Sequence, residues 1–308
     1  MLRRCEHRWA VPTGPYAGDA RARPLVVDLL LACHPEPAGV VTLLTSLLVL
    51  RAGRGWGAGW VAAAVLAGQC AVGWTNDYVD RDLDLAAQRL DKPLARARAA
   101  GDSAGSSRLQ PTTLRTAALV ALVATVPLSL ASGIGFTVAH LTAIAFAMAY
   151  NLGLKSTLLS FLPYTVAFGL LPTAVALSLP GPRWPATWAP IAGALIGAGG
   201  HFTQALPDIP ADRRLGVRGL PQAIGQRGSG AAAALLLLGA NATVALGPGS
   251  PGPIQLAGVA LATILAAGIV TTALLDQPKL SFRLTLAAAT AAVLAFLASG
   301  RSLVGAAL

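Results

Sequence analysis

Nine stretches of this chain are apolar over lengths that match the hydrocarbon core of a membrane. They fall at residues 25–50, 56–75, 114–131, 133–150, 158–179, 188–206, 230–246, 254–275 and 284–304. A helix crosses that core with roughly 17–25 apolar residues, and helices satisfy their own backbone hydrogen bonds there. Only 12% of the residues are charged, about half the share that is typical of soluble domains. We therefore predict an all-α integral membrane protein with about nine transmembrane helices, forming a single domain over residues 1–308.

The basic residues are divided unequally between the two sides of such a bundle. Of 23 lysines and arginines, only Arg51, Arg54, Arg183 and Arg301 fall in loops on the side opposite the N terminus. Cytoplasmic loops are enriched in basic residues, so this division predicts a cytoplasmic N-terminal segment at residues 1–24 and an outer C terminus. The net charge of +10 then reflects orientation and attraction to anionic lipid, and not binding of nucleic acid. Heavy use of Ala, Arg, Gly and Pro favours a bacterial source, and hence the inner membrane.

Two acidic motifs stand at the ends of apolar stretches. The first places Asn76, Asp80 and Asp84 at steps of four, which puts them on one helix face about 6 Å apart along the axis. The second repeats the pattern with Gln204, Asp208 and Asp212. Carboxylates beside membrane-spanning residues are costly unless a cation compensates them. Both motifs fall on the cytoplasmic side of the predicted topology.

Oxygen ligands of this kind suit a hard divalent cation. Mg²⁺ in particular keeps several waters and is held by one or two carboxylates together with phosphate oxygens of a substrate. Two facing clusters would hold Mg²⁺ ions with a diphosphate between them. The alternative is that the carboxylates form ordinary salt bridges with Arg81, Arg89 or Arg213.

Further candidates lie in the loops on the same side. Lys155 could place its charge on a diphosphate oxygen or extend towards lipid headgroups. Tyr150 could donate a hydrogen bond to a ligand or anchor the helix at the interface. Arg89 and Arg213 follow the two acidic motifs most closely and could close over a bound anion.

At superfamily level the chain resembles the UbiA intramembrane prenyltransferases. The resemblance rests on NDxxDxxxD at Asn76, Asp77, Asp80 and Asp84, a DKPLA segment at 91–95, Tyr150 to Lys155, and DxxxD at Asp208 and Asp212 followed by Arg213 and a GVRGLP run. It implies nine helices around a central cavity that is capped by cytoplasmic loops. The implied metal ligands are Asn76, Asp77, Asp80, Asp84, Gln204, Asp208 and Asp212. The diphosphate would contact Lys155, Arg89 and Arg213, and the catalytic set would be Lys155, Tyr150, Asp80 and Asp208.

The implied activity is Mg²⁺-dependent transfer of an isoprenyl group from its diphosphate to an aromatic or other lipophilic acceptor, as in quinone or lipid biosynthesis. Diphosphate is released, and no nucleic acid or obligate protein partner is implied. Superfamily relatives also include phosphoribosyl transferases that act on a polyprenyl phosphate and membrane terpene cyclases. A transporter with an acidic ion site is the non-enzymatic alternative. The chain departs from many relatives in having Gln204 in place of Asn, and His34-Pro35-Glu36 where an arginine is expected near the first helix.

Overall fold

The computed structural model describes residues 23–100, 109–247, 249–298 and 302–307. Most of the predicted N-terminal segment, residues 1–24, therefore lies outside the described residues. So do several basic residues that entered the prediction of orientation, namely Arg3, Arg4, Arg8, Arg21, Arg108 and Arg301.

The described residues form an all-α bundle with one small sheet. The α-helices are α1 (Leu25–Ala32), α2 (Pro35–Arg51), α3 (Ala58–Ala86), α4 (Pro93–Ala100), α5 (Pro111–Leu130), α6 (Ile134–Asn151), α7 (Leu162–Leu177), α8 (Trp188–Ala205), α9 (Ile209–Arg214), α10 (Leu220–Leu246), α11 (Pro253–Leu274) and α12 (Pro278–Ala298). Single 3-10 turns lie at Gly55–Gly57 and Leu154–Ser156. Strand β1 (Arg183–Pro185) pairs antiparallel with β2 (Val304–Ala307).

The predicted class, an all-α membrane protein, is confirmed. Each of the nine apolar stretches overlaps one helix of the described chain, except that the first is divided into α1 and α2. Within the described residues, six helices are long and apolar enough to cross a membrane, and α1 with α2 forms a seventh, bent span. The two remaining bundle helices are α7, which is short, and α8. At 1.5 Å per residue the 16 residues of α7 rise about 24 Å, less than the roughly 30 Å hydrocarbon core.

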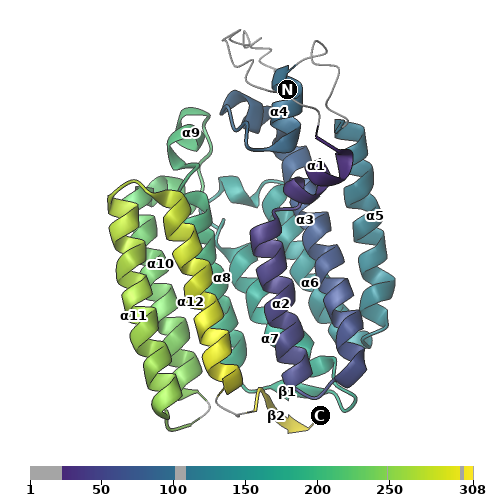
Figure 1. The fold of residues 1–308 in the computed structure, drawn as a ribbon, viewed down its shortest axis with the longest axis vertical. Coiled ribbons are helices and arrows are strands. Elements are labelled where there is room, and N and C mark those ends of the chain that lie inside the picture. Colours follow the sequence, from purple (N-terminus) through teal and green to yellow (C-terminus); the bar gives the residue numbers. More distant parts are fainter. Residues whose placement is uncertain (1–22, 101–108, 248, 299–301, 308) are drawn as a thin grey trace.

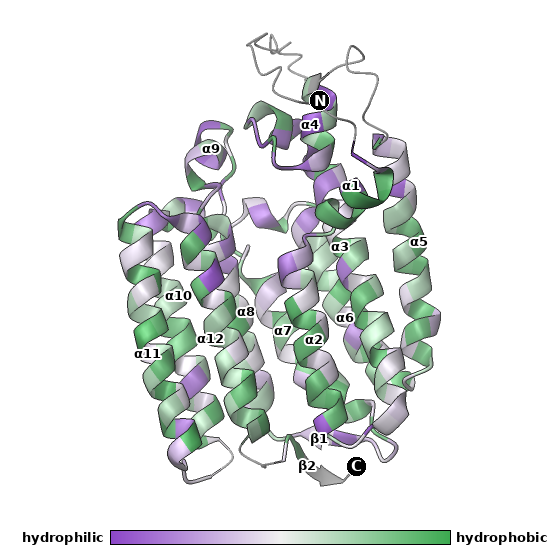
Figure 2. Ribbon diagram, viewed as in Figure 1, coloured by the Kyte–Doolittle hydropathy of each residue, from purple (hydrophilic) through white to green (hydrophobic). Residues whose placement is uncertain are grey.

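The long helices lie side by side, and the two ends of the bundle differ in character (Figure 1). At one end α1, α4 and α9 stand above the bundle, and hydrophilic residues gather there (Figure 2). At the other end β1 and β2 lie beneath the helices. Within the bundle, glycines allow close helix packing, as is common in membranes. A Cβ at Gly193 of α8 would lie 2.4 Å from the carbonyl oxygen of Phe168 in α7, and one at Gly197 only 2.3 Å from that of Tyr164.

The first span is broken at His34, where α1 meets α2 at an angle of 68°. His34 adopts a left-handed conformation with φ 57° and ψ 69°, which is uncommon for a residue with a Cβ. Pro35 follows and disfavours a helical conformation at the preceding residue. The break brings His34 to the polar end of the bundle, beside the end of α3.

Candidate active site

The first acidic motif lies on the last three turns of α3. Asp77, Asp80 and Asp84 are all buried, with relative exposures of 1%, 8% and 2%. Carboxylates this deeply buried need hydrogen bonds or opposite charges. The structure supplies these from loops that follow α3 and α6.

The second motif differs from the expected single helix. Helix α8 ends at Ala205, Asp208 stands just before α9, and Asp212 lies within α9. The prediction that Gln204, Asp208 and Asp212 form one ladder at helical steps of four is therefore wrong. The reason is Pro207, whose ring and missing N–H prevent the helix from continuing.

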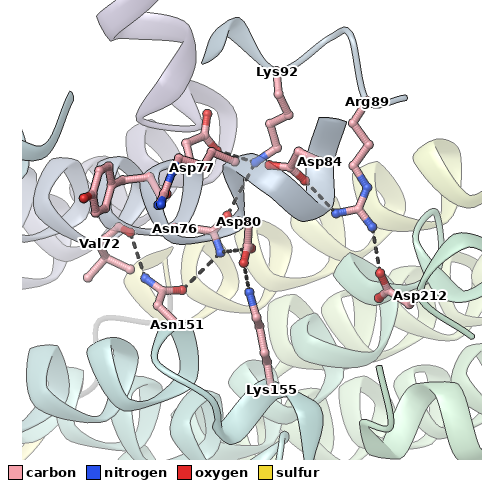
Figure 3. A network of polar contacts seen from close by, with 12 residues as sticks. Val72, Asn76, Asp77, Asp80, Asp84, Arg89, Lys92, Asn151, Lys155 and Asp212 are labelled. Atoms are coloured by element: carbon pink, nitrogen blue, oxygen red, sulfur yellow. Dashed lines mark hydrogen bonds and ion pairs between the residues drawn. The ribbon is translucent and has the colours of Figure 1, made fainter. Parts of the chain in front are cut away.

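Arg89 nevertheless joins the two motifs (Figure 3). Its guanidinium lies 2.9 Å from Asp84 Oδ1, 2.8 Å from Asp212 Oδ1 and 3.1 Å, through Nε, from Asp208 Oδ1. The salt-bridge alternative weighed from the sequence is thus realised for Arg89. It also shows that two segments more than a hundred residues apart converge on one point.

Burial and neighbouring charges shift the pKa values of Arg89 and of the carboxylates around it. Burial raises the pKa of Asp208 to about 6 and Asp212 adds to this rise, although Arg89 opposes it. The pKa of Asp212 is also raised, chiefly by burial. Burial disfavours the charge of Arg89, but Asp208, Asp212 and Asp84 together hold its pKa above the ordinary value. The cluster therefore holds more negative charge than Arg89 alone compensates.

Lys155 points into this site and not towards lipid. Its Nζ contacts Asp80 Oδ1, and Asn76 Nδ2 donates to the other oxygen of the same carboxylate at 3.0 Å. Asn76 also donates to Asn151 Oδ1 at 3.1 Å, and Asn151 in turn donates to the carbonyl of Val72 at 2.9 Å. Figure 3 shows this chain of contacts between α3, α6 and the loop that carries Lys155.

The loop of Lys155 is held by the GVRGLP run. A Cβ at Gly219 would lie 2.5 Å from the carbonyl oxygen of Lys155, so only glycine allows this approach. The backbone N–H of Leu220 donates to Ser160 Oγ at 3.1 Å on the same side. The run therefore places the Lys155 loop against the start of α10.

Asp77 faces a different group of residues. His34 Nε2 lies 3.0 Å from its Oδ1, and Lys92 Nζ contacts the same oxygen. Lys92 is also 3.4 Å from Asn76 Oδ1. Asp77 is thus engaged by His34 and Lys92, on the α1–α2 side of the motif.

Three other predicted residues, Gln204, Tyr150 and Arg213, have protein partners. Tyr164 donates a hydrogen bond of 2.5 Å to Gln204 Oε1, and the ring of Tyr150 packs edge-on against Tyr164 with centroids 5.2 Å apart. Arg213 donates to the backbone carbonyl of Gln222 at 2.6 Å, and its side chain does not line the polar cavity. The structure thus brings together the two Asp motifs, Arg89 and Lys155, but places Arg213 to one side.

Two cavities meet at this site. A polar cavity of about 650 Å³ is lined by Asn76, Asp80, Arg89, Lys155, Asp208 and Asp212 among others. An apolar cavity of about 280 Å³ continues into the bundle between α2, α3, α6, α7, α8 and α12. Both cavities are lined by His34, Asn76, Tyr150 and Gln204, so they adjoin at one level. The arrangement fits a ligand with a charged head and a long hydrocarbon tail.

The donors suit Mg²⁺ in kind. The residues that would hold it are Asp80, Asp208 and Asp212, which line the polar cavity, and Asp84, which contacts Arg89 beside them. Among the described residues, no three acidic, histidine or cysteine side chains are already arranged so that they could hold a metal ion. Mg²⁺ is usually held by one or two carboxylates with waters and substrate phosphates, so the donor set fits a metal that enters together with a diphosphate.

The sequence analysis missed three residues of this network. They are Asn151, which bonds Asn76, Tyr164, which bonds Gln204, and Gln222, whose Nε2 donates to Asp212 Oδ2 at 2.8 Å. Asn151 gave one usable signal, since an amide directly after Tyr150 ends an otherwise apolar helix. Tyr164 and Gln222 meet their partners only through tertiary packing.

Comparisons with known proteins agree with this geometry. Solved structures of a UbiA homologue from Aeropyrum pernix K1 (18% identity, TM-score 0.63, covering 86% of this chain and 98% of that one) and of a UbiA homologue from Archaeoglobus fulgidus bound to geranyl diphosphate and Mg²⁺ (16%, 0.56, 89% and 98%) share the fold. So does a structure from work on digeranylgeranylglyceryl phosphate synthase in membranes (15%, 0.57, 89% and 98%). No curated protein sequence matches the chain. Residues 39–278 match the model of the UbiA prenyltransferase family, and the chain therefore belongs to that family.

Proposed function

We propose that the protein transfers an isoprenyl group from an isoprenyl diphosphate to a lipophilic or aromatic acceptor at the polar end of the bundle. One observation carries the proposal above the others. Arg89 contacts carboxylates of both acidic motifs, and this doubly acidic site opens onto an apolar cavity that penetrates the bundle. A diphosphate with a prenyl tail matches both parts.

The chain's own residues supply most of what the reaction needs. When bound, Mg²⁺ would neutralise charge on the leaving diphosphate. Lys155, now on Asp80, is placed to donate to a diphosphate oxygen as negative charge develops there. Arg89 provides a second positive charge for the diphosphate. The three carboxylates that it contacts would then also bind the metal, which leaves part of the Arg89 charge available to the ligand. The allylic C–O bond breaks as diphosphate leaves, the acceptor forms a bond to the allylic carbon, and the acceptor loses a proton.

The apolar cavity would shelter the electron-deficient prenyl group from water. Aromatic rings stand where the two cavities meet, with Tyr150, Tyr164 and His201 packed within 5.2–5.7 Å of one another between ring centroids. The faces of such rings attract positive charge. We expect the allylic carbon to lie at this level, between the head and the tail of the substrate.

The same proposal assigns an orientation to a multi-pass membrane protein. The acidic site lies at the end of the bundle where the described chain begins, and β2 lies at the opposite end with Arg183. With the acidic end in the cytoplasm of a bacterial cell, the N terminus is cytoplasmic and the C terminus is outside. This orientation agrees with the excess of basic residues on that side.

The experiment is a diphosphate-release assay on purified protein with Mg²⁺, geranylgeranyl diphosphate and a panel of quinone precursors. We expect Asp80→Asn and Asp208→Asn each to lower the rate by roughly 100-fold or more. Asp82→Asn is the matched control, because this carboxylate lies on the same helix as Asp80, is exposed and, within the described part of the chain, pairs only with Arg81 and Arg98. Full activity in both site variants would overturn the proposal. Acceptor-independent formation of a cyclic hydrocarbon would replace it with a cyclase.

A further inference from the structure

The apolar cavity ends at a floor built partly from the C-terminal segment. We define the cavity floor as Leu48, Trp188, Phe296 and Leu303, all of which line the cavity or pack around its lower end. Leu48 lies near the end of α2, Trp188 begins α8, and Phe296 lies near the end of α12. These helix ends are on the side of the bundle opposite the acidic site (Figure 1).

The floor is tightly packed. The rings of Trp188 and Phe296 lie 5.1 Å apart between centroids. A Cβ added to Gly247 would lie 2.3 Å from Trp188 Cβ, so the residue that follows α10 packs closely against the Trp188 side chain. Leu303 is only 6% exposed and belongs to the same hydrophobic cluster.

Backbone pairing holds Leu303 in place. Ala186 N–H donates to the Leu303 carbonyl at 2.9 Å, and directly beyond it β2 pairs with β1 in a register that joins Pro185 to Val304. The short sheet therefore fixes the C-terminal segment beneath the bundle, and we call β1 together with residues 302–307 the C-terminal clasp. Residues 302–307 and all of α12 except its first residue lie beyond residue 278, where the match to the family model ends.

The floor lies at a definite depth below the site. Gln204, at the level where the cavities meet, is sixteen residues along α8 from Trp188, a rise of about 24 Å. On α2 the fourteen residues from His34 to Leu48 give about 21 Å. Two helices on different sides of the cavity thus give similar depths.

We infer that the cavity floor, with Leu303 of the C-terminal clasp as its removable element, sets the longest isoprenyl tail that the protein accepts. The inference rests on the proposed function and adds a specificity determinant to it. Packed interiors are nearly incompressible, so a tail that reaches the floor must either stop there or displace a side chain. Removing the Leu303 side chain deepens the cavity, and enlarging it makes the cavity shallower.

The experiment compares kcat/KM for geranyl, farnesyl, geranylgeranyl and longer prenyl diphosphates in competition. We expect the wild-type protein to discriminate sharply against tails beyond one length. Leu303→Ala should raise relative use of the next longer substrate by roughly 10-fold, the selectivity typical of small changes in apolar pockets, and Leu303→Trp should shift preference to shorter tails. Leu294→Ala is the control, since it makes the same change at a position of α12 that is 48% exposed.

A second measurement uses binding alone. A geranylgeranyl diphosphate analogue with a photoreactive group at the tail end should label peptides that contain Trp188 or Leu303 in the wild-type protein. Transfer activity with an unchanged length preference in both Leu303 variants, or labelling confined to lipid-facing residues, would overturn the inference and leave the proposed function intact. Labelling of the floor in a protein that transfers no prenyl group would support the floor and refute the transferase.

Discussion

Arg89 is the residue whose removal should most disturb the ligand-free protein. Its side chain is 15% exposed and contacts Asp84, Asp208 and Asp212 at 2.8–3.1 Å. Arg89→Gln removes the charge that these carboxylates share and leaves them facing one another. Breaking a buried ion pair from one side costs about 3–5 kcal/mol, and we expect a loss near the lower end because the polar cavity admits water. The apparent melting temperature in detergent should therefore fall by several degrees without Mg²⁺.

Mg²⁺ with inorganic diphosphate should reverse much of that loss. A divalent cation between the carboxylates replaces the missing guanidinium, so ligand addition should raise the melting temperature more in Arg89→Gln than in the wild-type protein. Arg98→Gln is the control, because its ion pair with Asp82 is exposed and should contribute less than about 1 kcal/mol. The reasoning is refuted if Arg89→Gln and Arg98→Gln are equally stable without Mg²⁺, or if ligand stabilises all three proteins alike.

Three further predictions concern neighbouring groups. Because the pKa of Asp208 is raised to about 6, lowering the pH through 6 protonates this carboxylate, and the affinity for Mg²⁺ and diphosphate measured by calorimetry should fall over that interval. An affinity that stays constant from pH 7 to pH 5 would contradict this. Lys92→Met should lower the melting temperature clearly more than Lys279→Met, because Lys92 pairs with the buried Asp77, whereas Lys279 is exposed and lies 3.9 Å from Asp91. Equal effects of the two substitutions would show that the contact between Lys92 and Asp77 contributes little to stability. Gln204→Leu should weaken binding of Mg²⁺ and diphosphate by less than about 10-fold, since Tyr164 already donates a hydrogen bond to the Gln204 Oε1. A loss of affinity as large as that caused by Asp208→Asn would instead indicate that Gln204 contacts the metal directly.

The sequence was sufficient for the fold because hydropathy in a membrane protein is a strong and local signal. Pro35 and Pro37 in the first apolar stretch indicate a kink or a late start of the first helix, and the structure breaks that helix at His34. The first acidic motif was also predictable, since uninterrupted helical spacing places Asn76, Asp80 and Asp84 together. The second was only partly so. Its carboxylates reach the site, but Pro207 and Pro210 indicated a helix break that the step-of-four pattern obscured.

Tertiary contacts account for what could not be predicted. Arg89 and Arg213 looked equivalent in sequence, each being a loop arginine beside an acidic motif. The structure turns Arg89 between the motifs and Arg213 towards the backbone of α10, a difference that depends on how α9 packs. The cavity floor was likewise beyond the sequence, because the pairing of residues near 184 with residues near 305 carries no local signal.

The central claim is that the two acidic motifs form one site for Mg²⁺ and a diphosphate. A double-mutant cycle on Asp84→Asn and Asp212→Asn tests it most directly, with calorimetric binding of a non-hydrolysable prenyl diphosphate analogue in the presence of Mg²⁺. Residues that share one ligand network show coupling of about 0.5–3 kcal/mol, so we predict that the double variant loses clearly less affinity than the sum of the single losses. Additive losses, or a motif whose variant binds like the wild-type protein, would contradict a shared site.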